Sequence, residues 1–285
     1  MSQTVEQIRN TESTEISHES TLFAEPILHV GNFNITNSLI MSWITVAVLV
    51  TFFVVSGKKA KKSTKSVPKG LHNFFEIILE QALVMADSVT NDRKKTLKFL
   101  PIILALFLFV LMSNWMGLLP GVGTIGFVET GEHGKVFVPL FRGATADLNT
   151  TLAIGLFSVV LSHVLGVISI GVWNHFNKFV NIKAIIAIPK KIKKDPMILM
   201  VNPIKIFVGL IEIIGEVAKI ASLSLRLFGN IFAGEVLLAS MMSISAFLLP
   251  LPFMFMELIV GIVQALVFAI LTLAFISIAT TAEEH

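Results

Sequence analysis

The sequence contains no cysteine and few charged residues. Without cysteine, the 285-residue chain can form no disulfide bond, no thiolate metal site and no cysteine nucleophile. Charged residues make up 14% of the chain and hydrophobic residues 54%, whereas globular domains carry about 25% charge. This composition indicates an integral membrane protein. The net charge is only +3 and the lysines lie between apolar runs, which favours a role in membrane topology over nucleic-acid binding.

The apolar segments predict an all-α fold with about five membrane crossings. The first apolar run, residues 38–56, carries no charge and is long enough to cross a ~30 Å hydrocarbon core. No apolar run follows closely behind a basic start, so we expect this segment to stay in the mature protein. We expect a polar outer segment over residues 1–37 and one membrane domain over residues 38–285, with helices at residues 38–56, 73–90, 96–119, 147–173, 203–243 and 248–281.

Lysine-rich loops predict the orientation in the membrane. Six lysines lie between residues 58 and 69, and seven lie between residues 174 and 205. By the positive-inside rule both loops are cytoplasmic, so the N-terminus is outside and, after five crossings, the C-terminus is cytoplasmic. Residues 73–90 mix apolar and acidic residues and have basic residues beyond both ends. We interpret them as an amphipathic helix on the inner interface, with a core helix of a soluble domain as the alternative.

From residue 203 the chain is apolar almost to its end. A single helix over residues 203–249 would be ~70 Å long, more than twice the thickness of the membrane core. Such a helix must tilt steeply, break, or turn back before Pro250. We expect two long, strongly tilted helices that form an antiparallel pair.

Glycines at positions 121, 123 and 126 match the pattern of a dinucleotide-binding loop. That motif functions between a strand and a helix, whereas this one follows a predicted membrane span. We therefore expect no nucleotide binding here, and the sequence indicates no other cofactor and no metal site.

A polar stripe lies on one face of the predicted helix 203–243. At about 100° per residue, its members fall within roughly 80° of one another: Glu212, Glu216, Lys219, Leu223, Arg226 and Asn230. An arginine in hydrocarbon costs at least ~2.5 kcal/mol. Arg226 has no acidic residue three or four positions away, so we expect a negatively charged partner on another chain. The alternative is an ion pair with an acid of its own helix that only holds helices together.

The sequence around Arg226 resembles one protein family. Residues 224–235 (Ser-Leu-Arg-Leu-Phe-Gly-Asn-Ile-Phe-Ala-Gly-Glu), residues 263–268 (Val-Gln-Ala-Leu-Val-Phe) and the closing Ala-Glu-Glu-His are similar to subunit a of bacterial F-type ATP synthases. Weaker similarity at residues 114–120 and 146–150 extends the resemblance over most of the chain after the first span. It implies a stationary, non-catalytic subunit of the bacterial inner membrane that conducts protons through two offset half-channels. The implied partners are a rotating c-ring that carries membrane carboxylates, the b subunits of the peripheral stalk, the rest of the complex, and membrane lipids.

The resemblance also implies roles for individual residues. Those matched to proton translocation are Arg226, as the essential arginine, Glu235, Glu257, Gln264, Asn230 and Glu212. Glu257 stands where some relatives have histidine, and either residue can relay protons. Further candidates for the channel lining are Asp147 and Asn149 at the outer mouth, Ser222 and His163, and also Glu216 on the inner side, which the resemblance does not match to a family role. For each acid the alternative is a structural, hydrogen-bonded carboxyl, and for His163 it is a hydrogen-bonded packing role.

The spacing of the matched residues predicts the register of the antiparallel pair. If Arg226 is level with Gln264, the centre of the hairpin lies near Ser245, and if Glu235 is level with Glu257, it lies one residue further along. Both pairs place the reversal at residues 243–247, ahead of the prolines.

Two other functions remain as alternatives. A secondary transporter would use Arg226 to bind an anionic substrate, but such transporters have paired halves with matching broken helices, and we find none in the sequence. A purely structural scaffold would tolerate apolar residues at Arg226, Glu235 and Gln264. The residues also leave proton and sodium open as the cargo, because the ion site would lie mainly on the ring.

Overall fold

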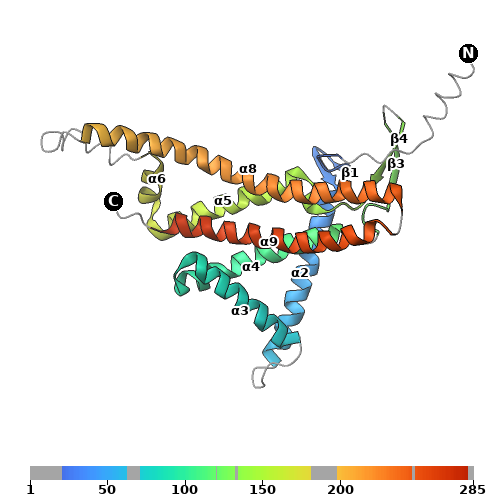
Figure 1. Cartoon of the computed structure of the whole chain (residues 1–285), viewed down its shortest axis with the longest axis horizontal. Coiled ribbons are helices and arrows are strands. Elements are labelled where there is room, and N and C mark those ends of the chain that lie inside the picture. Colours follow the sequence, from blue (N-terminus) through green and yellow to red (C-terminus); the bar gives the residue numbers. More distant parts are fainter. Residues whose placement is uncertain are drawn as a thin grey trace, which may run out of the picture. The chain divides into compact units, whose positions relative to one another are not determined.

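The computed structural model describes residues 21–62, 71–119, 121–131, 134–180, 198–245 and 248–281 (Figure 1). Its helices are α2 (Asn37–Lys62), α3 (Leu71–Thr90), α4 (Arg93–Gly117), the short 3₁₀ helix η1 (Ala144–Ala146), α5 (Leu148–Ile170), α6 (Val172–Val180), α8 (Ile198–Ile244) and α9 (Pro250–Thr280). Two antiparallel hairpins complete the described part of the chain: β1 (Pro26–Val30) with β2 (Phe33–Thr36), and β3 (Gly126–Gly131) with β4 (Gly134–Pro139).

Five of the described helices are long and apolar enough to cross a membrane. These segments are Asn37–Val55, Arg93–Gly117, Leu148–Ile170, Phe207–Ile244 and Pro250–Thr280. The predicted all-α, multi-pass membrane protein is thereby confirmed. The amphipathic helix expected at residues 73–90 corresponds to α3, which is not among the five.

The last two helices are the longest in the described chain. Helix α8 has 47 residues, a length of ~70 Å, so it cannot stand perpendicular to a ~30 Å hydrocarbon core. Of the three outcomes allowed by the sequence, a break is excluded within Ile198–Ile244, because α8 is one continuous helix over these residues. The chain does turn back before the prolines, between Ile244, the last residue of α8, and Pro250, the first residue of α9. The steep tilt of α8 in the membrane stays a prediction.

The chain forms two compact units. The first comprises Met1–Pro68, Ala105–Thr151 and Leu225–Leu266, and the second comprises Lys69–Leu104, Leu152–Ser224 and Val267–His285. Helices α4, α5, α8 and α9 each contribute one part to each unit.

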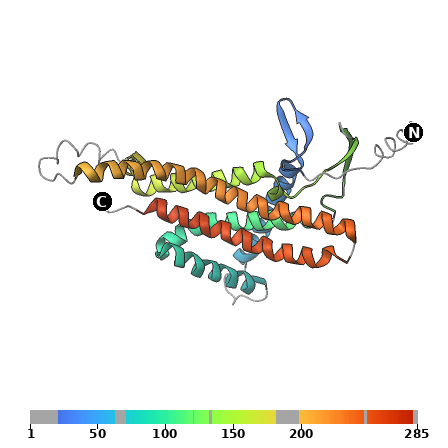
Figure 2. The same ribbon diagram turned by 45° about the horizontal axis from the view of Figure 1, so that its top comes forward.

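In the first unit, the end of α8 and the start of α9 run side by side (Figures 1 and 2). The amide of Asn230 donates a hydrogen bond to Oε1 of Gln264 across 3.4 Å, which agrees with the predicted register to within one helical turn. Helix α9 begins at Pro250, a favourable first position because proline has no N–H to satisfy. The expected reversal at residues 243–247 overlaps the end of α8, and its residues 246 and 247 lie outside the described residues.

Helix α4 is joined to α9 in the same unit by its last turns. Asn114 is buried, donates to the carbonyl oxygen of Gly261 at 3.1 Å, and accepts a hydrogen bond from Thr145 at 2.8 Å. The indole of Trp115 donates to the carbonyl oxygen of Leu258 at 3.2 Å. Residues that carried the weaker part of the resemblance therefore have a clear structural role.

The hairpins were not foreseen from the sequence. In the first, Gly31 has a φ of 63° and occupies the two-residue turn between Val30 and Phe33, where a left-handed conformation suits the strand twist. The second hairpin begins at Gly126. The glycine motif at residues 121–126 thus lies between helix α4 and strand β3, which is not the strand–loop–helix setting of a dinucleotide site.

Two sharp corners shape the second unit. Gly171, with a φ of 85°, separates α5 from α6, so α6 folds back toward α5. Between α3 and α4, Thr90 and Thr96 share a hydrogen bond of 2.6 Å, and Arg93 forms an ion pair with Asp87. The core of this unit includes the fully buried side chains of Phe99, Phe268 and Ile276.

Candidate functional site

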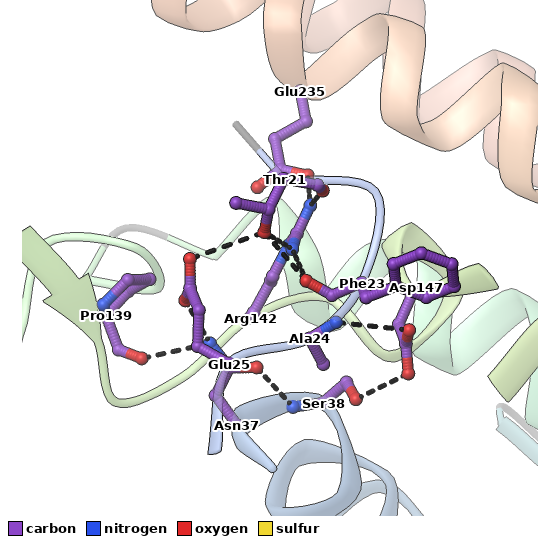
Figure 3. Close-up of polar contacts among 10 residues, drawn as sticks. All are labelled: Thr21, Phe23, Ala24, Glu25, Asn37, Ser38, Pro139, Arg142, Asp147 and Glu235. Carbon is purple, nitrogen blue, oxygen red and sulfur yellow. Dashed lines mark hydrogen bonds and ion pairs between the residues drawn. The ribbon is translucent and has the colours of Figure 1, made fainter. Parts of the chain in front are cut away.

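An arginine of the first unit links helix α8 to the N-terminal segment. We call Thr21, Phe23, Arg142 and Glu235 the Arg142 cluster (Figure 3). Nη1 of Arg142 donates to Oγ1 of Thr21 at 3.1 Å and to the carbonyl oxygen of Phe23 at 3.2 Å. Its Nη2 donates to the carbonyl oxygen of Thr21 at 2.7 Å and to Oε2 of Glu235 at 3.2 Å. The guanidinium of Arg142 therefore binds both the backbone at Thr21 and Phe23 and the carboxylate of Glu235, which was matched to proton translocation.

Burial strengthens the contact between these two charges. The side chain of Arg142 is 4% exposed and that of Glu235 is 33% exposed. A buried guanidinium needs a negative partner, and Glu235 supplies it. Sequence reasoning identified Glu235 but missed Arg142, because the two residues are 93 positions apart. The one signal for Arg142 in the sequence was its position five residues before Asp147, a candidate for the channel lining.

Asp147 is enclosed by hydrogen-bond donors from three segments. Its Oδ1 accepts from the backbone N–H groups of Ala24 and Asn149, each at 3.2 Å. Its Oδ2 accepts from the hydroxyls of Ser38 and Thr150, each at 2.9 Å. The side chain is 3% exposed and precedes the first residue of α5, the position of an N-cap. This geometry favours the structural alternative for Asp147 over a place in the channel lining, whereas Asn149 is exposed.

We expect Asp147→Ala to act on stability rather than on ion flow. The change removes an N-cap, a loss of ~0.5–2 kcal/mol, and leaves four donors without their acceptor. The purified protein should therefore unfold at a lower temperature, while assembled protein should conduct ions at close to the normal rate. Asn149→Ala is the matched control for stability and should leave the unfolding temperature unchanged, because the side chain of Asn149 is exposed. A large loss of conduction in well-folded Asp147→Ala protein would instead restore the channel-lining interpretation.

Glu257 lies against α8 beside Glu235. Its side chain is 6% exposed, and its carboxyl group packs onto Gly234, where an added Cβ would overlap it. Glycine at position 234 is therefore what allows this carboxyl group to approach the backbone of α8. The predicted pairing of Glu235 with Glu257 on one level of the hairpin agrees with this contact.

Arg226 lies on an exposed surface of α8. Arg226 and Asn230 are exposed, whereas Leu227, about 100° further round the helix than Arg226, is completely buried. Asn230 contacts Gln264, which is itself 7% exposed. Nε2 of Gln264 is buried and has no hydrogen-bond partner within the described residues. Ser222, one turn before Arg226, is exposed as well.

Three helices of the second unit bring titratable side chains together. We call His163 of α5, His175 of α6, and Glu216 and Lys219 of α8 the His163 cluster. Nε2 of His163 lies 3.3 Å from Oε2 of Glu216, and its Nδ1 lies 3.1 Å from Nε2 of His175. Nζ of Lys219 donates to Oε1 of Glu216 at 2.7 Å and lies 5.2 Å from the ring centre of Phe275. Glu212, one turn earlier on α8, is half-buried.

The predicted stripe on α8 thus does not share one environment. Glu216 and Lys219 contact side chains of other helices, Leu223 is buried, and Arg226 and Asn230 are exposed. His175 joins the candidate residues from the structure alone. Its signal in the sequence was weak, since it lies beyond the predicted third span.

The sequence of this chain matches the ATP synthase A chain family over residues 39–277. The chain belongs to that family. ATP synthase subunit a of Syntrophobacter fumaroxidans is 32% identical over 246 residues, which are 86% of this chain and 84% of that protein. Subunit a of Mycobacterium ulcerans is 32% identical over 242 residues, which are 84% of this chain and 85% of that protein. Subunit a of Geotalea uraniireducens is 31% identical over 249 residues, which are 87% of this chain and 89% of that protein.

Membership of the ATP synthase A chain family confirms the resemblance drawn from the residues around Arg226. It does not favour the secondary transporter. The chain is therefore a multi-pass membrane component of an ATP synthase. The family match begins at residue 39, so Thr21 and Phe23 of the Arg142 cluster lie outside it, whereas Arg142 and Glu235 lie inside.

Proposed function

We propose that this chain is the stationary, non-catalytic proton-conducting subunit of a rotary F-type ATP synthase. It works in the bacterial inner membrane beside a ring of c subunits, each carrying one membrane carboxylate, and is held by b subunits of a peripheral stalk. The observation that carries the proposal is the guanidinium of Arg226, exposed on an apolar helix that is long enough to cross the membrane. Family membership supports it independently.

The chemistry of Arg226 suits this role. A ring carboxylate that leaves lipid must ionise to release its proton, and a fixed cation beside it favours the ionised form. At ~4 Å and an effective dielectric constant near 20, the attraction is about 4 kcal/mol, enough to promote ionisation without permanent capture. The same positive charge repels a proton that would pass directly between two half-channels. Ion flow is then forced to travel with the ring.

The two clusters serve opposite sides in this proposal. The Arg142 cluster and Glu257 belong to the outer half-channel, and the His163 cluster with Glu212 belongs to the inner one. The lysine-rich loop before α8 supports this assignment, because it places the N-terminal end of α8 in the cytoplasm by the positive-inside rule. The N-terminus is then outside and the C-terminus cytoplasmic.

A single-cysteine cross-linking experiment tests the contact with the ring. Because the chain has no cysteine of its own, Asn230→Cys introduces its only thiol, on the exposed surface next to Arg226. In the assembled complex we expect a disulfide with a cysteine placed beside the ring carboxylate. Leu227→Cys is the matched control, since this position is completely buried. Equal cross-linking at both positions, or purification without any small ring subunit, would contradict the proposal.

A further inference from the structure

The imidazole of His163 is placed between two groups that exchange protons. One ring nitrogen faces the carboxylate of Glu216 at 3.3 Å, and the other faces a ring nitrogen of His175 at 3.1 Å. An imidazole can accept a proton on one nitrogen while it releases a proton from the other. His163 therefore connects α8 to α6 through a continuous chain of titratable groups.

The backbone makes room for this chain at two glycines. Gly171 forms the left-handed corner that turns α6 back, and the N–H of His175 donates to the carbonyl oxygen of Gly171 at 3.1 Å. Gly166 lies one turn after His163 on α5. A Cβ at Gly166 would come within 2.8 Å of Cε1 and 2.9 Å of Nδ1 of His175, so the ring of His175 fits against α5 only because this residue is glycine.

The charged neighbours of Glu216 and the burial of His175 also favour proton transfer in the His163 cluster. Glu216 is 17% exposed and is shared by Lys219 and His163 on its two oxygens. Nζ of Lys219 lies over the ring of Phe275 and donates to Glu216; a cation in this place favours the carboxylate form of Glu216, so a protonated Glu216 readily gives its proton to His163. His175 is 4% exposed, so its ring is shielded from competing contacts with solvent or lipid.

We propose that Glu216, His163 and His175 form a proton relay from α8 to α6. The proposal rests on the function proposed above and deepens it, because it assigns a path to the inner half-channel. A protonated Glu216 gives its proton to Nε2 of His163, while the proton on Nδ1 of His163 passes to Nε2 of His175. The products are a Glu216 carboxylate, His163 with its proton on Nε2, and a His175 imidazolium, so the relay delivers the proton from α8 to α6. Because the side chain of His163 is 30% exposed, exchange with water, with one proton taken up on Nδ1 and one lost from Nε2, restores the starting tautomer.

A packing role for the same residues makes a different prediction. The side-chain amide of glutamine can donate and accept hydrogen bonds as His163 does, but it does not transfer protons at neutral pH. His163→Gln should therefore preserve a structural bridge and interrupt a relay. Gly166→Ala keeps every titratable side chain but displaces the ring of His175; because its Cβ would also come within 2.8 Å of the carbonyl oxygen of Ala279, its result is read together with that of His163→Gln.

The experiment measures proton flux through the assembled complex in proteoliposomes, with and without added imidazole. We expect both variants to lower the flux about tenfold, because side chains that transfer protons contribute at least this much. Free imidazole should restore much of the flux in His163→Gln, as a mobile carrier replaces the missing ring. Ser158→Ala, which removes a different buried hydrogen bond of α5, should conduct normally.

The outcomes separate the relay from the proposed function. Normal flux in assembled His163→Gln, or a loss of flux that imidazole does not restore, would overturn the relay. The Arg226→Ala variant, measured in parallel, reports on the motor. If that variant loses coupled pumping while His163→Gln conducts normally, the relay fails and the proposed function stands.

Discussion

Replacing Arg226 with alanine should abolish ATP-driven proton pumping. The substitution removes the cation that promotes ionisation of each arriving ring carboxylate, an attraction of about 4 kcal/mol, equivalent to roughly a thousandfold in the ionisation equilibrium. It also removes the barrier between the half-channels. We therefore expect pumping below detection together with persistent passive proton flow. Acidification of inverted membrane vesicles, measured on addition of ATP and again after removal of the catalytic sector, tests both expectations.

Two further variants sharpen the test of Arg226. Leu225→Ala is the control, because Leu225 is the exposed neighbour of Arg226 and carries no charge; it should pump at close to the normal rate. Arg226→Lys keeps the charge but loses the planar fork of donors, and its pumping should be strongly reduced. An Arg226→Ala protein that pumped normally would end the motor interpretation.

The second large effect is expected at the ion pair of Arg142 and Glu235. Glu235→Gln removes a group that exchanges protons and should lower proton pumping about a hundredfold. Arg142→Gln leaves that carboxylate in place but releases it, along with the segment at Thr21 and Phe23, and should lower pumping about tenfold through misplacement. We call Arg142 a positioning residue, since in this structure it acts through Glu235.

A double-mutant cycle distinguishes this positioning role from a general loss of structure. If Arg142 acts through Glu235, the double variant should pump no worse than Glu235→Gln alone, because interacting residues are not additive. Arg93→Gln is a matched control, because it breaks the ion pair between Arg93 and Asp87, whose side chains are 53% and 34% exposed. Exposed ion pairs contribute little to stability, so this variant should pump at close to the normal rate. Fully additive effects at Arg142 and Glu235 would contradict the proposed coupling.

Local patterns explain why much of this protein could be predicted. A membrane span needs an uninterrupted apolar run, so the span at residues 38–56 and the long helices after residue 203 are visible in the sequence itself. The position of Arg226 within such a helix is equally local. The hairpin at Pro26–Thr36 was missed because its strands have only five and four residues, too short for a clear alternating pattern.

Side-chain partners were predictable only where the helical period determines them. The period placed Glu216 and Lys219 on one face of α8, and these two residues do form an ion pair. The same reasoning could not find His175, because the corner at Gly171 decides that α6 returns toward α5.

By itself, the sequence determined the class of protein, its long apolar helices and the place of Arg226 within one of them, because these depend on composition and on neighbours a few residues away. Only the tertiary structure decided that Arg142 reaches Glu235 and that Asp147 is enclosed by donors from three segments. Hydrogen bonds of this kind join residues 93 and 123 positions apart. Their geometry depends on the whole path of the chain between them, which no short pattern encodes.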